Sequence, residues 1–168
     1  MSAPDRLERL YTPHRMNYVR EAGPASVGCP FCAMADEHPG EGLVVARGVS
    51  TFAVLNLYPY NPGHLMVLPS RHVADYTELT EAETVELATM TQDAVRAIRA
   101  VSTPHAFNIG INLGTVAGGS LADHLHQHVV PRWSGDANFL TVVAGTKTLP
   151  QLLEETRDLL TESWKSLG

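Results

Sequence analysis

Three histidines alternate with other residues in the run His124-Leu125-His126-Gln127-His128-Val129-Val130-Pro131. Successive side chains of an extended strand point to opposite faces, so this spacing predicts a strand over residues 124–130 with all three imidazoles on one face. Histidine packs no better than the β-branched residues that a sheet prefers, so the alternation indicates a site. A neutral imidazole can be a nucleophile, a proton carrier or a metal ligand, and the run alone leaves these roles open.

Length and charge limit the kind of protein that carries this run. The chain has 168 residues, of which 44% are hydrophobic, enough for one domain with a core. No apolar stretch is long enough to span a bilayer and the N-terminus lacks an apolar signal segment, so a cytoplasmic protein without a membrane partner is expected. The formal net charge of −6 argues against nucleic acid as a partner. A small anionic ligand held by backbone amides is still compatible with that charge.

The only two cysteines, Cys29 and Cys32, stand in a Cys-x-x-Cys pair. A structural disulfide is disfavoured in a cytoplasmic chain, which leaves half of a metal site or a redox dithiol. Eight histidines provide candidates for the missing ligands, among them His38, which is close in sequence.

The remaining pattern predicts an arm and one domain. Prolines interrupt residues 1–28, which are expected to form an N-terminal arm, and residues 29–168 form a single domain. Thr80 and Glu83 make a capping-box pattern that opens a helix running to about residue 100, and a second helix is expected from near Pro150 to near Trp164. Strands are predicted at 43–47, 51–57, 64–68, 107–113, 124–130 and 139–143. This order predicts an α+β fold on a mainly antiparallel sheet.

A glycine-rich loop from residue 112 to residue 120 precedes the histidine run. Glycines allow backbone amides to converge on an anion, but the same composition also suits an ordinary turn. The Walker pattern is absent. The position of the loop beside three imidazoles favours phosphate binding.

The run His-Leu-His-Gln-His-Val-Val resembles the histidine-triad signature of the HIT family, and the resemblance extends over residues 42–133. Asn-Pro-Gly-His-Leu-Met-Val at 61–67 and Pro-Ser-Arg-His-Val at 69–73 resemble two further elements of the family. Gln127 replaces a hydrophobic residue of the signature and is expected to face away from the imidazoles. The Gly-Gly-Ser loop and residues 135–139 are similar to an actinobacterial subgroup that phosphorolyses diadenosine tetraphosphate.

This resemblance implies a HIT-like antiparallel half-barrel sheet with two helices, paired into a homodimer. The apolar face of the long helix is the candidate for the dimer interface, although its periodicity suits core packing equally. It implies nucleotidyl transfer from a dinucleoside polyphosphate through a covalent intermediate on His126, with His128 and His124 completing the catalytic set. By the same resemblance Asn56, Asn112, Gly119 and Ser120 bind substrate, and His64 supports the triad from behind. It also implies a structural zinc ion on Cys29, Cys32, His72 and His124. A zinc-bound His124 would not be free for proton transfer.

Several alternatives stay open at this point. Inorganic phosphate as acceptor gives ADP and ATP, whereas water gives AMP and ATP. A purine nucleotide phosphoramidase releasing AMP would use the same triad. Two alternatives come from other functional classes: a nucleotide-binding protein without turnover, and a metal-dependent hydrolase.

Overall fold

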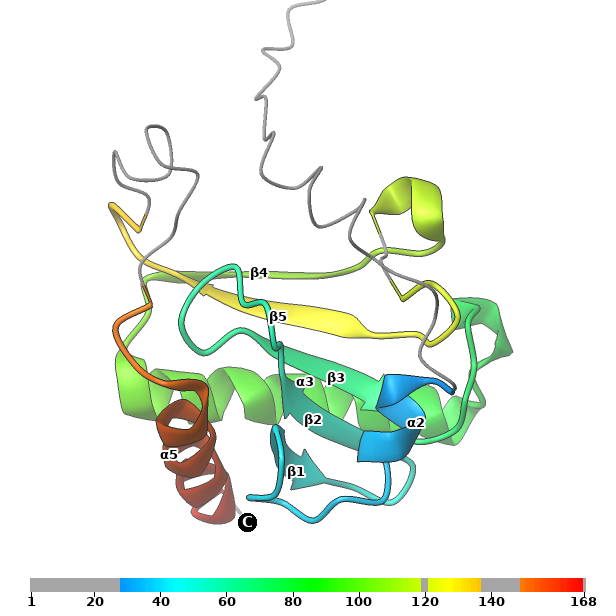
Figure 1. Ribbon diagram of the computed structural model, residues 1–168, viewed down its shortest axis with the longest axis horizontal. Helices are drawn as coiled ribbons and strands as arrows, with labels where there is room; N and C mark the ends of the chain where they lie inside the picture. The colour runs from blue at the N-terminus through cyan, green and yellow to red at the C-terminus, as the bar shows by residue number, and fades with distance from the viewer. Residues whose placement is uncertain (1–27, 119–120, 137–148, 168) are drawn as a thin grey trace, which may run out of the picture.

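The computed structural model describes residues 28–118, 121–136 and 149–167. Its centre is a five-stranded antiparallel sheet in the order β1-β2-β3-β5-β4 (Figure 1). The strands are β1 (Val44–Arg47), β2 (Thr51–Leu55), β3 (Leu65–Pro69), β4 (Ala106–Ile111) and β5 (Gln127–Arg132). The predicted strand at 139–143 and nearly all of the predicted arm lie outside the described residues.

Two long helices cover one face of this sheet. Helix α3 (Glu81–Ser102) opens with the predicted capping box: the Thr80 hydroxyl accepts from the Glu83 amide at 3.2 Å, and the Glu83 carboxylate accepts from the Thr80 amide at 2.8 Å. Helix α5 (Leu153–Lys165) packs against α3 and β1. Helix α5 begins at Leu153, slightly later than the predicted start near Pro150, because Leu152 is still extended (φ −68°, ψ 151°).

The two faces of the sheet carry separate apolar clusters. Side chains from the strands pack with Leu87, Ile98 and Leu160 on the face covered by α3 and α5, and Trp164 joins this main core. The opposite face holds a smaller cluster in which Phe31 of the short helix α2 (Pro30–Met34) meets Phe52 and Met66. Figure 1 shows α3 behind the sheet and α2 in front of it. Helix α2 was not predicted.

The histidine strand starts later and ends later than predicted. Strand β5 begins at Gln127, and the Leu125 amide donates to the Val73 carbonyl at 2.7 Å instead of joining the ladder. Only His128 of the three histidines therefore lies within the strand. Pro131 does not end the strand, because beyond Val129 β5 pairs with β4 alone and a missing N–H is tolerated there.

Three shorter differences complete the comparison. Strand β2 ends at Leu55, where Asn56 turns the chain by accepting from the Tyr58 amide at 2.9 Å. Two 3₁₀ turns, Tyr76–Glu78 and Thr115–Ala117, were not predicted, and the second lies inside the glycine-rich loop. Within the described residues, no helix combines the length and apolarity that crossing a membrane requires.

Candidate active site and metal centre

His126 is held as one defined tautomer. Its Nδ1 lies 2.8 Å from the carbonyl oxygen of His124, and a carbonyl only accepts, so Nδ1 carries the proton. The other nitrogen, Nε2, is then left with its lone pair. The side chain is 6% exposed, and burial lowers the pKa of the imidazole from its usual value. A buried, neutral imidazole with Nε2 available is suited to nucleophilic attack.

A chain of hydrogen bonds fixes the second imidazole, His128. The Tyr60 amide donates to Nδ1 of His64 at 3.1 Å, so a neutral His64 carries its proton on Nε2. That Nε2 lies 2.9 Å from Nδ1 of His128, which must accept and therefore carries its own proton on Nε2. Burial, with the neighbouring charges of His128 and His126, lowers the pKa of His64 to about 3 and keeps the His64 imidazole neutral within this hydrogen-bond relay. His128 is thereby prepared as a hydrogen-bond donor.

The third imidazole, His124, turns away from this pair toward the cysteines. Its Nε2 donates to the Pro69 carbonyl at 2.9 Å, which leaves Nδ1 as the atom with a lone pair. Nδ1 lies 3.4 Å from Cys29 Sγ and 3.6 Å from Cys32 Sγ. Burial lowers the pKa of His124, so the ring is neutral and can ligate a metal.

His72 completes a group of four metal-ligating side chains. Its Nδ1 lies 3.3 Å from Cys32 Sγ, and the ligand atoms of Cys29, Cys32, His72 and His124 all lie within 4.8 Å of one another. Tetrahedral zinc with ordinary Zn–S and Zn–N bonds would separate sulfur and nitrogen by about 3.5 Å, so the spacing fits. Burial and the adjacent Cys29 raise the pKa of the Cys32 thiol, and a bound cation would offset this by favouring the thiolate. Two thiolates and two imidazoles are a donor set that zinc prefers.

The substrate-binding candidates are brought together in part. Asn56 follows β2, and its backbone amide donates to the His64 carbonyl at 2.9 Å. This bond places Asn56 beside the His64–His128 relay. Asn112 follows the end of β4 directly, two residues beyond Gly110, which pairs with His128 in the β4–β5 ladder. Gly119 and Ser120 lie outside the described residues.

Sequence reasoning missed two residues of this site. Tyr60 donates the amide that sets the relay, and its ring lies 4.8 Å from the His64 ring. Phe31 lies between the cysteines and packs on His124 and His126. The position of Tyr60 four residues before His64 was the available signal for the first, but none marked Phe31 as more than an apolar residue. The prediction for Gln127 is confirmed, since its amide donates to Thr91 of α3 at 2.7 Å, away from the imidazoles.

Comparisons with known proteins agree with this geometry. The sequence profile of the HIT domain family matches residues 41–135. The AP-4-A phosphorylase of Mycobacterium tuberculosis is 57% identical over 167 residues, which covers 95% of this chain and 86% of that protein. Among solved structures, a Zn-bound histidine triad family protein from Mycobacterium smegmatis matches with a TM-score of 0.67 and 27% identity over 85% of this chain and 97% of that one. A histidine triad nucleotide-binding protein from Sulfolobus tokodaii matches with a TM-score of 0.68 and 28% identity, covering 83% of this chain and 93% of that one.

Proposed function

The chain belongs to the HIT domain family, and on that basis we propose that it is a diadenosine tetraphosphate phosphorylase acting through a covalent intermediate on His126. The observation that carries the proposal is the 2.8 Å contact between His126 Nδ1 and the His124 carbonyl. This contact leaves Nε2 as the nucleophilic atom and gives the cation formed during attack a hydrogen-bond acceptor. The relative at 57% identity, an AP-4-A phosphorylase, supports the choice of substrate and acceptor.

In the first step, His126 Nε2 forms a bond to an α-phosphorus of diadenosine tetraphosphate. The bond from that phosphorus to the bridging oxygen breaks, and ATP leaves with the electron pair. His128 donates from Nε2 to the reacting phosphate oxygens, where negative charge is redistributed during the displacement. The proton on His126 Nδ1 stays at the His124 carbonyl, so the nucleophile needs no separate base.

In the second step, an oxygen of inorganic phosphate forms a bond to the same phosphorus. The P–N bond breaks, His126 returns to its neutral form, and ADP leaves. Two displacements at one centre replace a single reaction between two anions. We assign Asn56 to the ribose, and Asn112 with Gly119 and Ser120 to the phosphates.

We infer that Cys29, Cys32, His72 and His124 hold a structural zinc ion. The donor set and its spacing support zinc, as does the Zn-bound neighbour of the same family. Zinc would supply a fixed point for these four side chains, and both ring nitrogens of His124 would then be engaged. His124 would act in catalysis through its carbonyl alone.

Neither cysteine is in a disulfide, which fits a reducing compartment, so we place the protein in the cytoplasm.

We also propose that the protein is a homodimer, and that its partners are the nucleotide and phosphate. The apolar side of α3, where an interface was expected, is buried against the sheet of its own chain. Among the described residues, strand β4 instead forms an edge of the sheet, and Ile109 at its middle is 50% exposed. An exposed strand edge favours pairing with a second copy, and sedimentation at several concentrations tests for a dimer.

Product analysis tests the proposed activity. Wild type and His126→Ala are incubated with diadenosine tetraphosphate, with and without inorganic phosphate, and the nucleotides are separated. Wild type should form ADP and ATP only with phosphate, and without it should accumulate an adenylylated protein detectable by intact mass in neutral denaturant. AMP and ATP regardless of phosphate would make the enzyme a hydrolase. No turnover in either condition would reject the dinucleotide as substrate.

A further inference from the structure

We propose that Phe31 is a positioning residue for His126: held between the two cysteine ligands on α2, its ring keeps the nucleophilic imidazole in place. This role rests on the proposed function, in which His126 is the nucleophile. The packing that supports it is independent of the substrate.

The ring of Phe31 contacts two histidines, His124 of the cysteine cluster and His126 of the proposed active site. Its centroid lies 5.5 Å from the His124 ring, edge-on at 73°, and 5.3 Å from the His126 ring at 47°. Phe31 is 5% exposed, so these contacts are made away from solvent. Aromatic rings at such distances attract one another beyond the effect of area alone.

His126 is confined from a second direction by His128. The two rings lie 5.0 Å apart at 82°. The bond to Cβ and the hydrogen bond from Nδ1 to the His124 carbonyl hold one edge of the imidazole, and neither lies against the faces of the ring. Phe31 and His128 pack against the ring itself and restrict its remaining tilt, so that Nε2 is held in one direction.

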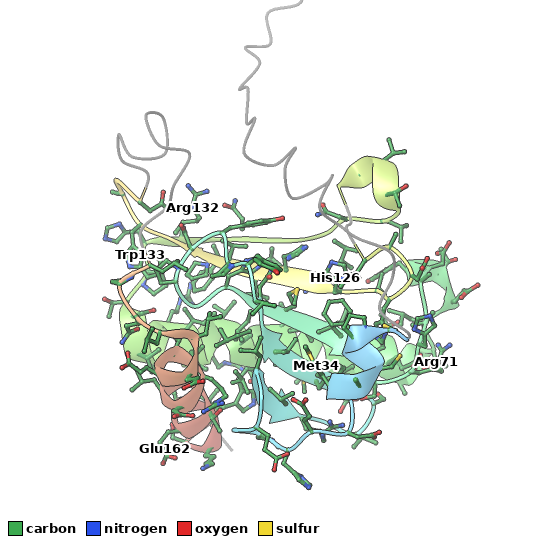
Figure 2. The ribbon with its side chains drawn as sticks, in the orientation of Figure 1. Met34, Arg71, His126, Arg132, Trp133 and Glu162 are labelled. Atoms are coloured by element: carbon green, nitrogen blue, oxygen red, sulfur yellow. The ribbon has the colours of Figure 1, made fainter. Side chains whose placement is uncertain are left out.

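Helix α2 is too short to hold Phe31 unaided. It has five residues, and its N-cap, Cys29, makes no side-chain capping bond. A single isolated turn of helix is unstable in water. At its C-terminal end the Arg47 guanidinium donates to the carbonyls of Met34 and Glu37, at 3.3 and 2.8 Å. The other end is anchored by the cysteines, so the ligand cluster sets where the Phe31 ring lies. Figure 2 shows Met34 on this helix and His126 at the nearby end of β5.

Phe52 is the matched control for Phe31. It belongs to the same apolar cluster and is fully buried, but its ring faces the Arg47 guanidinium at 5.9 Å. It stands on β2, opposite Leu68 and Arg47 in the ladder. Phe31→Leu and Phe52→Leu remove the same atoms from the same cluster, and only the first removes a ring from His126.

The experiment compares zinc-loaded wild type with these two variants. Zinc content, Tm, kcat and KM for phosphorolysis, and the imidazole resonances in ¹H–¹⁵N spectra are measured for each. Both variants should lose Tm and retain zinc. Phe31→Leu alone should lose between about 10- and 100-fold in kcat with KM unchanged within about twofold, since a displaced reacting group has costs of that order. Its His126 resonances should shift or broaden, while those of Phe52→Leu match wild type.

Three results would overturn the assignment. Equal losses of kcat in both variants would reduce Phe31 to a core residue. A raised KM with unchanged kcat would mean that Phe31 contacts the substrate itself. Unaltered His126 resonances in Phe31→Leu would remove the positioning role even if wild type turned over no dinucleotide. That last readout separates failure of this inference from failure of the proposed function.

Discussion

The two faces of the sheet share their strands but are held together by different interactions. The face under α3 and α5 is an aliphatic core, with Leu87, Ile98 and Leu160 each at most 2% exposed. The face under α2 has a smaller apolar cluster, and beside it imidazoles, thiols and carbonyls are joined by hydrogen bonds. Apolar burial is non-directional, whereas hydrogen bonds and metal ligation fix atoms in place. The first face therefore supplies stability through apolar burial, and the second supplies orientation.

The largest expected effect of this division is on the rate. His126→Ala removes the proposed nucleophile, and we expect kcat to fall by at least about 10⁴-fold, as for other covalent catalysts. The folded state should persist, because the main core lies on the other side of the sheet. Steady-state kinetics and circular dichroism check this prediction. Residual activity within about tenfold of wild type would place the nucleophile elsewhere.

Removal of the metal should lower both the stability of the fold and the catalytic rate. We expect chelation, or Cys32→Ser, to lower Tm by about 10 °C or more, because metal affinity is folding free energy when the site forms only in the native state. kcat should fall as well, through loss of order around His124 and His126. His38→Ala is the control: His38 is an exposed histidine outside the ligand cluster, and this variant should keep its zinc. Thermal scans with zinc analysis decide the matter, and a chelator-insensitive Tm would contradict a structural ion.

A substitution in the aliphatic core should lower stability and leave kcat almost unchanged. Leu160→Ala opens a cavity under α5 and should cost about 2–5 kcal/mol of unfolding free energy. The kcat of the folded fraction should stay within about twofold of wild type, because Leu160 lies on the face opposite the imidazoles. Urea denaturation and kinetics below the transition test both halves of the prediction. A loss of kcat comparable to that of Cys32→Ser would show that the two faces are not separable.

The smallest expected effect is a dependence of stability on pH. The pKa of His64 falls from 6.5 to about 3 on folding, so between these values the unfolded chain binds a proton that the folded chain does not. Stability contributed by neutral His64 is therefore present above pH 6.5 and is lost as the pH falls toward 3. From pH 7 to pH 5 the loss should be about 2 kcal/mol.

His64→Leu is the control for this pH dependence, since leucine does not titrate while the cysteine cluster responds to acid in both proteins. Urea denaturation at pH 7 and pH 5 should show a smaller decline for the variant than for wild type. Parallel declines would mean that His64 has an ordinary pKa in the folded protein.

The sequence by itself determined the α+β class, the capping box of α3 and the direction of Gln127 away from the imidazoles, and it predicted the chemistry of the histidine run. These follow from periodicity, side-chain chemistry and the family resemblance, all of which are encoded locally. It did not determine that His124 turns toward the cysteines while His126 and His128 stay together. The spacing of the three histidines in the sequence predicts one shared strand face, but only His128 is in the ladder.

Only the tertiary structure decided how those imidazoles are used. Pro69 and the cysteines take both ring nitrogens of His124, the His124 carbonyl takes one nitrogen of His126, and Tyr60 acts through His64 on His128. Each of these partners except the His124 carbonyl comes from another segment of the chain. Strand periodicity specifies the face on which a side chain lies, and the atoms brought to that face by other segments specify which nitrogen carries the proton.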